Sequence, residues 1–442
     1  MNVKKIFIIL LVLIALPLVM PAPGQAIPAF ARKYGFNCMM CHTAFPKLND
    51  WGQRYRDNGY QLPGQVGKEK TMFDSHTPIA LRTAVGFNGY SVKPNEDANY
   101  QTTSGFGLRG LDLLAAGVMH KNISVLVIYT PRIDEPFADY TGMDGSQPGA
   151  LESASIIFSN IIPNALNVRV GRFEPAYHLF SSKRSYYLLS PYDVYEYPTG
   201  GNDFLFGDNQ IGVEASGHYR TGFKYAAGLV NGTGAKPDNN KFKDVYLTLS
   251  QTIGPGDGQS AGQRIGAFVY YGKQPMIAPV TTLIPVGDTT FTGTGPPPGI
   301  SPTGEYDGGN NGAYYRYGGS ASLNWKTFNL AAMYMRALDD KAFNALDPAK
   351  NYEYAGGFVE LDYAGLWNNR LVASALYNWV APPSYDDENS KITAYSGLMR
   401  YYLGDWSAVN VALHGEYTYR KLEAGEATMT ENIYSMLVDF GF

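Results

Sequence analysis

The sequence predicts an all-β transmembrane barrel of about 16 antiparallel strands, preceded by a short helical N-terminal segment. Three observations support this fold class: alternating apolar and polar residues from residue 77 onward, connections that alternate in length, and an aromatic final strand. The composition agrees, with 34 Tyr and 49 Gly in 442 residues and only 17% charged residues. Membrane barrels place apolar side chains outward, polar ones inward and aromatic ones at both interfaces.

Residues 1–26 are typical of a secretory signal peptide. Lys4 and Lys5 form a positive start, residues 6–19 form an apolar core, and small residues lead to an expected cleavage after Ala26. The apolar run is short for a membrane-spanning helix, which takes about 20 residues. Removal is therefore favoured over retention as an anchor, and the mature chain is expected to leave the cytoplasm.

Residues 27–76 form a second predicted unit, whose central motif is Cys-Met-Met-Cys-His at positions 38–42. Cys38 and Cys41 are the two cysteines of the chain. This C-x-x-C-H spacing is typical of covalent haem attachment, in which both cysteines form thioethers and His42 ligates the iron. A thioredoxin-like dithiol would need a βαβ setting and a zinc site a second group of ligands, and the flanking sequence predicts neither. We therefore predict one covalent haem c.

The iron ligand on the opposite face is left open by the sequence. Met72 and His76 are the nearest downstream candidates, His120 lies at a predicted short turn near the barrel mouth, and an open position is the remaining alternative. For His42, we expect the second ring nitrogen to bond a backbone carbonyl, because such a bond fixes the orientation of a ligating imidazole.

A short helix is expected directly after the motif. Pro46 suits the first position of a helix, and Trp51 and Tyr55 recur at helical spacing. Gly59 favours a helix end, because glycine tolerates the left-handed cap conformation. We expect the apolar face of this helix to pack on the porphyrin, and residues 64–76 to form a linker to the barrel.

The barrel is predicted from residue 77 to residue 442 by a period of two. Leu166, Val168 and Val170, for example, alternate with Asn, Arg and Gly. About sixteen such segments occur, each long enough for the roughly 9–11 residues of a tilted membrane strand. Their alternation predicts one face toward lipid and one toward a lumen.

The connections between these segments alternate between short and long. Residues 120–122 and 163–165 are short, whereas residues 131–150, 176–208 and 274–310 are long. Bacterial barrels have short periplasmic turns and longer extracellular loops. The final predicted strand ends on Phe442, which resembles the recognition signal of outer-membrane barrel proteins.

Two groups of barrel residues are candidates for function. Arg82 and Arg169 fall on or near inward phases of strands, and Glu360 also lies within a strand. They would line an aqueous lumen, or contact haem propionates or a charged solute. The second group is a run of tyrosines in a long loop, which would fold inward or line a surface site: Tyr186, Tyr187, Tyr192, Tyr195 and Tyr197.

The N-terminal region resembles the fused cytochrome–porin family, whose best-known members are outer-membrane iron-oxidising monohaem cytochromes. The resemblance rests on residues 29–35, 38–42, 45–49 and 58–60, and the barrel resembles the family in architecture. It implies a bacterial outer-membrane protein that passes electrons between an extracellular partner, such as Fe(II), and a periplasmic cytochrome, in either direction. It carries over the haem-binding residues Cys38, Cys41 and His42.

A segment of about fifty residues makes a poor core by itself. We therefore expect the barrel to complete the haem pocket, with the segment seated in or at the lumen. A solute-diffusion porin with a structural or sensory haem plug is the alternative function, and a redox enzyme with an open haem site is another. The net charge of −4 gives no basic footprint for nucleic acid.

Overall fold

The computed structural model describes the chain in separate ranges, namely residues 29–34, 40–62, 64–74, 78–131, 150–189, 192–197, 202–254, 262–275, 282–286, 289–293, 311–344, 346–347, 349–367, 370–384, 386, 390–403 and 410–441. The predicted signal peptide, Cys38, His76 and Phe442 lie outside these residues. What the sequence indicates for them stays a prediction.

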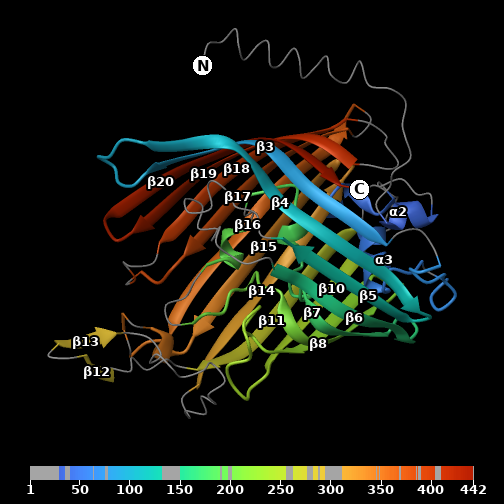
Figure 1. Ribbon diagram of the computed structural model, residues 1–442, viewed down its shortest axis with the longest axis horizontal. Coiled ribbons are helices and arrows are strands. Elements are labelled where there is room, and N and C mark those ends of the chain that lie inside the picture. Colours follow the sequence, from blue (N-terminus) through green and yellow to red (C-terminus); the bar gives the residue numbers. More distant parts are fainter. Residues whose placement is uncertain are drawn as a thin grey trace, which may run out of the picture.

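Sixteen antiparallel strands of the described chain close into a barrel, which confirms the predicted fold class (Figure 1). Each strand pairs with the next one in the barrel, and the pair β20–β3 closes it. In chain order the strands are β3 (Ile79–Lys93), β4 (Gln101–His120), β5 (Ile123–Thr130), β6 (Ala150–Ile162), β7 (Leu166–Phe173), β8 (Gln210–His218), β9 (Phe223–Val230), β10 (Asp244–Ile253), β11 (Gln263–Pro275), β14 (Asn311–Trp325), β15 (Phe328–Asp339), β16 (Tyr352–Leu366), β17 (Leu371–Ala381), β18 (Lys391–Tyr402), β19 (Asn410–Ala424) and β20 (Ala427–Gly441).

The two faces of the wall differ as the sequence pattern predicts. On β16, Val359 and Leu361 point outward and are 38% and 44% exposed, whereas Glu360 points inward and is fully buried. Successive side chains of a strand point to opposite faces, so the pattern gives the barrel an apolar outer surface suited to lipid. None of the described helices is long and apolar enough to cross a membrane.

The N-terminal segment (described residues 29–34, 40–62 and 64–74) lies at the end of the barrel that carries the short turns, here called the short-turn mouth. Figure 1 places its helices beside the C-terminus. Its elements are α2 (Ala29–Tyr34), β1 (His42–Ala44), β2 (Lys47–Leu48) and α3 (Asp50–Asp57).

The expected helix begins later than predicted. It starts at Asp50 rather than Pro46, because the Asn49 side chain caps it by accepting a hydrogen bond from the Gly52 amide at 2.8 Å. Pro46 lies instead in the turn between β1 and β2. This hairpin holds His42 in a short strand directly before the turn.

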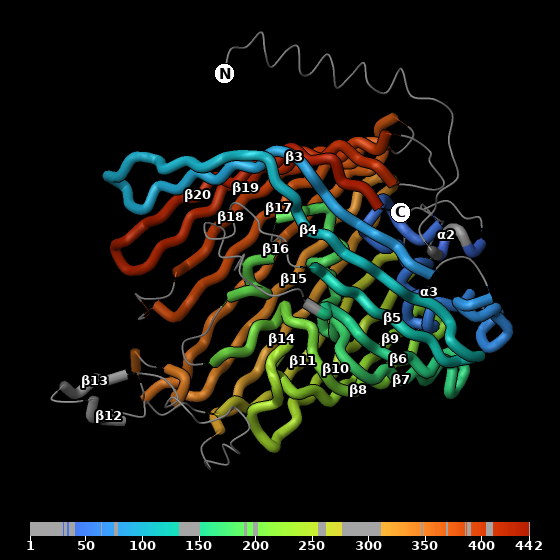
Figure 2. The backbone as a smooth tube through the Cα atoms, viewed as in Figure 1, coloured from blue at the N-terminus to red at the C-terminus, as the bar shows by residue number. Residues whose placement is uncertain are grey.

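The described parts of the long connection between β7 and β8 fold into the barrel, and we call these residues, 174–189, 192–197 and 202–209, the plug loop. It includes the short 3-10 helices η3 (Ser182–Arg184) and η4 (Asp193–Tyr195), and Figure 2 shows it inside the ring of strands. Other elements lie in the remaining long loops: the hairpin β12 (Thr282–Val286) and β13 (Thr289–Gly293), and η5 (Lys341–Phe343).

Aromatic packing holds the plug loop against the inner wall. Tyr192 stacks on Phe358 of β16 with ring centroids 3.9 Å apart, and Phe204 packs on Tyr314 of β14 at 4.9 Å. The five tyrosines singled out in the sequence are all buried here, none more than 4% exposed. They fold inward, and they form a dry core where an open porin has a polar lumen.

Candidate functional site

An apolar cavity of about 280 Å³ lies between the N-terminal segment and the barrel wall at the short-turn mouth. Aromatic side chains line it on the segment side: Phe30, Tyr34, Trp51, Tyr55 and Tyr60. Aliphatic side chains of β3, β4 and β5 line it on the wall side: Ala80, Leu81, Leu114, Ala116, Leu126 and Ile128. The barrel therefore completes a pocket that the segment alone could not enclose.

Cys41 and His42 both line this cavity. The His42 Nδ1 atom lies 3.0 Å from the Pro46 carbonyl oxygen, which is the orienting bond that the sequence predicts. Burial lowers the pKa of His42 to about 4, and the positive charges of Arg184 and Arg82 add to this effect. The imidazole is therefore neutral at neutral pH, the form in which histidine ligates metals.

Helix α3 approaches the Cys41 backbone closely. The backbone N–H of Asn49 donates to the Cys41 carbonyl oxygen at 2.9 Å. A Cβ atom at position 52, where the chain has glycine, would collide with the same oxygen. A glycine at this position of the helix is what allows the motif and α3 to pack together. The attachment role of Cys38 and Cys41 stays a prediction, because Cys38 lies outside the described residues.

Neither of the two described candidates for the opposite iron face, Met72 and His120, lines the cavity. Met72 instead donates its backbone N–H to the Val118 carbonyl at 2.7 Å. His120 is the last residue of β4 and is exposed. Apart from the motif residues, the described lining residues that could donate a ligand atom are phenols, carboxylates and the amine of Lys183, and they include no methionine and no second histidine.

Helix α2 supplies a part of the pocket that sequence reasoning missed. Phe30 stacks on Tyr60 with centroids 4.9 Å apart, and Tyr34 meets Tyr55 edge-on at 6.1 Å. The signal was present as two aromatic residues four apart, which share one face of a helix. The aromatic walls, a cysteine and a neutral imidazole together fit a porphyrin joined to this motif.

Buried ion pairs fasten the segment inside the mouth. Lys47 of β2 reaches across to β16, where its Nζ lies 2.6 Å from Glu360 and also contacts Asp362. Burial alone lowers the pKa of Lys47, but the two carboxylates outweigh it and the pKa lies above its usual value. On the opposite side, Lys224 of β9 binds Asp57 of α3 at 2.5 Å.

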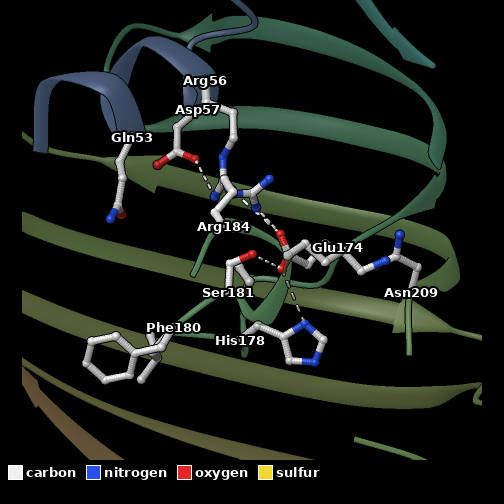
Figure 3. A network of polar contacts seen from close by, with 12 residues as sticks. Gln53, Arg56, Asp57, Glu174, His178, Phe180, Ser181, Arg184 and Asn209 are labelled. Atoms are coloured by element: carbon white, nitrogen blue, oxygen red, sulfur yellow. Dashed lines mark hydrogen bonds and ion pairs between the residues drawn. The ribbon is translucent and has the colours of Figure 1, made fainter. Parts of the chain in front are cut away.

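A polar network joins α3 to the plug loop (Figure 3). The Glu174 carboxylate accepts a hydrogen bond from Ser181 at 2.5 Å, pairs with Arg184, and lies 3.8 Å from Arg56 of α3. His178 Nδ1 lies 3.9 Å from the same carboxylate. Burial alone raises the pKa of Glu174, but these cationic neighbours more than offset it and lower the pKa to about 2.

A second, smaller cavity of about 110 Å³ lies on the other side of the N-terminal segment. Most of its lining residues have polar side chains, among them Gln53, Arg264 and Asn329. Arg264 donates to Gln53 at 3.1 Å. The segment therefore separates an apolar space, which holds the motif residues, from a polar one.

No protein-family model matches the chain, and no curated protein matches its sequence. Its structure is similar to that of an anion-selective porin from Comamonas acidovorans, with a TM-score of 0.53 and 14% identity over 82% of this chain and 99% of that one. It is also similar to the outer membrane channel DcaP of Acinetobacter baumannii, with a TM-score of 0.51 and 10% identity over 82% and 97% of the two chains. The described chain therefore has the fold of an outer-membrane porin.

Proposed function

We propose that the protein is an outer-membrane cytochrome–porin, which holds one covalent haem c at its short-turn mouth. It passes electrons between an extracellular donor or acceptor, with Fe(II) as the first candidate, and a periplasmic carrier. The observation that carries this proposal is the apolar cavity into which the N-terminal segment brings Cys41 and His42. A bound haem c would supply reversible one-electron transfer, with a potential tuned by its ligands and surroundings.

The residues of the chain have separable tasks in this proposal. Cys41, with Cys38, anchors the porphyrin, and the Pro46 carbonyl orients the His42 ring. The aromatic face of α3 and the wall strands exclude water from one side of the pocket. The short turns mark the periplasmic end of outer-membrane barrels, so the pocket would open toward a periplasmic carrier.

The plug loop supports this function over free diffusion of solutes. Its aromatic side chains pack on the inner wall of strands such as β10, β11, β14 and β16, and the buried ones are no more than 6% exposed. A diffusion porin keeps a polar, water-filled interior. The alternative of a solute porin is supported by the fold alone, and in that case a haem would be a structural plug or a sensor.

The decisive experiment is a haem stain on a denaturing gel, together with a visible spectrum of the protein purified from outer membranes. The host needs working haem-attachment machinery. We expect a stained band in the wild type and in Met40→Ala, which changes an exposed residue between the two cysteines of the motif, and none in Cys38→Ala/Cys41→Ala. A colourless wild-type protein would overturn the proposal.

Two further measurements separate the candidate functions. Electron transfer with iron predicts that dissolved Fe(II) or Fe(III) changes the visible spectrum of the membrane-embedded protein, and an unchanged spectrum with both would exclude iron as the external partner. A solute porin predicts measurable conductance in planar bilayers that Cys38→Ala/Cys41→Ala leaves unaltered.

A further inference from the structure

We propose that three cations of the barrel, Arg82, Lys183 and Arg184, bind the two carboxylates of a porphyrin held in the apolar cavity. This inference rests on the proposed function and assigns it residues outside the haem motif. Two of the three belong to the plug loop, so the porphyrin would be held jointly by the N-terminal segment, the wall and the plug.

All three cations line the apolar cavity, and they come from two separate elements. Arg82 lies on β3, and Lys183 and Arg184 form the end of η3. Their side chains are 17%, 31% and 25% exposed, so each is partly accessible from a largely apolar space. Long cationic side chains in such positions normally have a charged group to meet.

The charge of the cavity lining fits a dianion. The described lining residues include four cations, with Arg56 as the fourth, and two carboxylates, Asp112 and Glu152. The lining therefore carries an excess of two positive charges. Asp439 and Glu174, which lie outside the lining, pair with Arg82 and Arg184. The two propionates of a haem would join these carboxylates as further acceptors for the cations.

Each cation also keeps hydrogen-bonding capacity beyond its protein partner. Within the described part of the chain, Asp439 binds one terminal nitrogen of Arg82, at 3.3 Å, and Glu174 binds one terminal nitrogen of Arg184. A guanidinium has five N–H donors and pairs readily with a carboxylate in a two-pronged geometry. Lys183 binds Glu152 at 2.8 Å through one ammonium group with three donors.

The test is the haem midpoint potential, measured by spectroscopic redox titration of purified protein. We expect Arg82→Gln, Lys183→Gln and Arg184→Gln each to keep the haem stain and to lower the potential, because loss of a nearby positive charge favours the ferric state. Arg184→Lys should restore most of the loss. The matched control is Arg420→Gln, which removes another wall cation paired with the plug, through Asp193 at 2.5 Å, but one that does not line the cavity.

The outcomes separate this inference from the proposed function. Attached haem with potentials equal to those of the wild type and of Arg420→Gln would overturn the inference and leave the function standing. A wild-type protein without haem would overturn both. Lys183→Gln is the safest variant, because this side chain is the most exposed of the three, and heat-dependent gel mobility reports whether each barrel has folded.

Discussion

Two segments fill the inside of this barrel, and they are held in different ways. The plug loop packs buried aromatic rings against the wall, with the ion pair between Asp193 and Arg420 beside them. The N-terminal segment is fastened by ion pairs, such as Lys47 with Glu360 and Asp57 with Lys224, and leaves a cavity of about 280 Å³ beside its aromatic face. Protein interiors are normally close-packed, so an apolar space beside a well-packed core indicates a place for a bound group rather than loose folding.

Removing an aromatic anchor from the plug should have the largest effect. Tyr195 is 1% exposed, packs on Phe206 and Tyr192, and donates to the Phe180 carbonyl at 2.9 Å. We expect Tyr195→Ala to lower the free energy of unfolding by about 3–5 kcal/mol, as for other large aromatic truncations in cores. Urea unfolding in detergent micelles measures the change.

The control for this variant is a tyrosine on the outer face. Tyr334 is 48% exposed on the lipid-facing side of β15, and Tyr334→Ala should cost much less in the same assay. Proteoliposome swelling should rise only for Tyr195→Ala, because only that change loosens the interior. Equal losses for both variants would mean that the plug is not a packed core.

Breaking the main ion pair of the N-terminal segment should lower the free energy of unfolding by about 3 kcal/mol. This value is at the lower end for a buried pair, because Lys47 is 19% exposed. Lys47→Met leaves Glu360 and Asp362 side by side without their shared cation. We expect the segment to become sensitive to limited proteolysis while the barrel stays folded. Lys236→Met is the control, since this exposed lysine pairs with Asp203 at the surface, and a similar cleavage rate in both variants would contradict the role of Lys47.

The titration of Lys47 itself affects its pairing only in the alkaline range. Its pKa is raised in the folded protein, so its contribution to stability is complete below the usual lysine pKa and is lost as the pH rises through the higher folded value. Loss of the proton from Lys47 should therefore not release the N-terminal segment in the neutral range.

The sequence predicts the wall of this molecule better than its interior. Strand alternation is a local pattern, and residues such as Val359, Glu360 and Leu361 follow it directly. The start of α3 was placed wrongly because Pro46 and Asn49 both suit a helix start, and only the hairpin around Pro46 decides between them. A pocket between the segment and the barrel was predicted, but its lining residues were not, because they include Arg184 and Leu126, which lie far from the motif in the chain.

The link between the two interior segments offers the finest test of how they differ. Glu174 of the plug loop lies between two arginines, Arg184 of the same loop and Arg56 of α3. These neighbours lower the pKa of Glu174 to about 2. A carboxylate with a lowered pKa stabilises the fold above its ordinary pKa, and the contribution disappears as the pH falls through the folded value. We expect a loss of about 2 kcal/mol between roughly pH 5 and pH 2, after allowance for partial exposure of the arginines.

This loss should depend on Glu174 itself. In Glu174→Gln the unfolding free energy should start lower at pH 6 and fall less steeply toward pH 2 than in the wild type. Glu353→Gln removes a carboxylate that is 57% exposed and pairs with Arg336 on the surface, so its curve should run parallel to that of the wild type. If Glu174→Gln also ran parallel, the polar network would not couple α3 to the plug, and the two segments would fill the barrel independently.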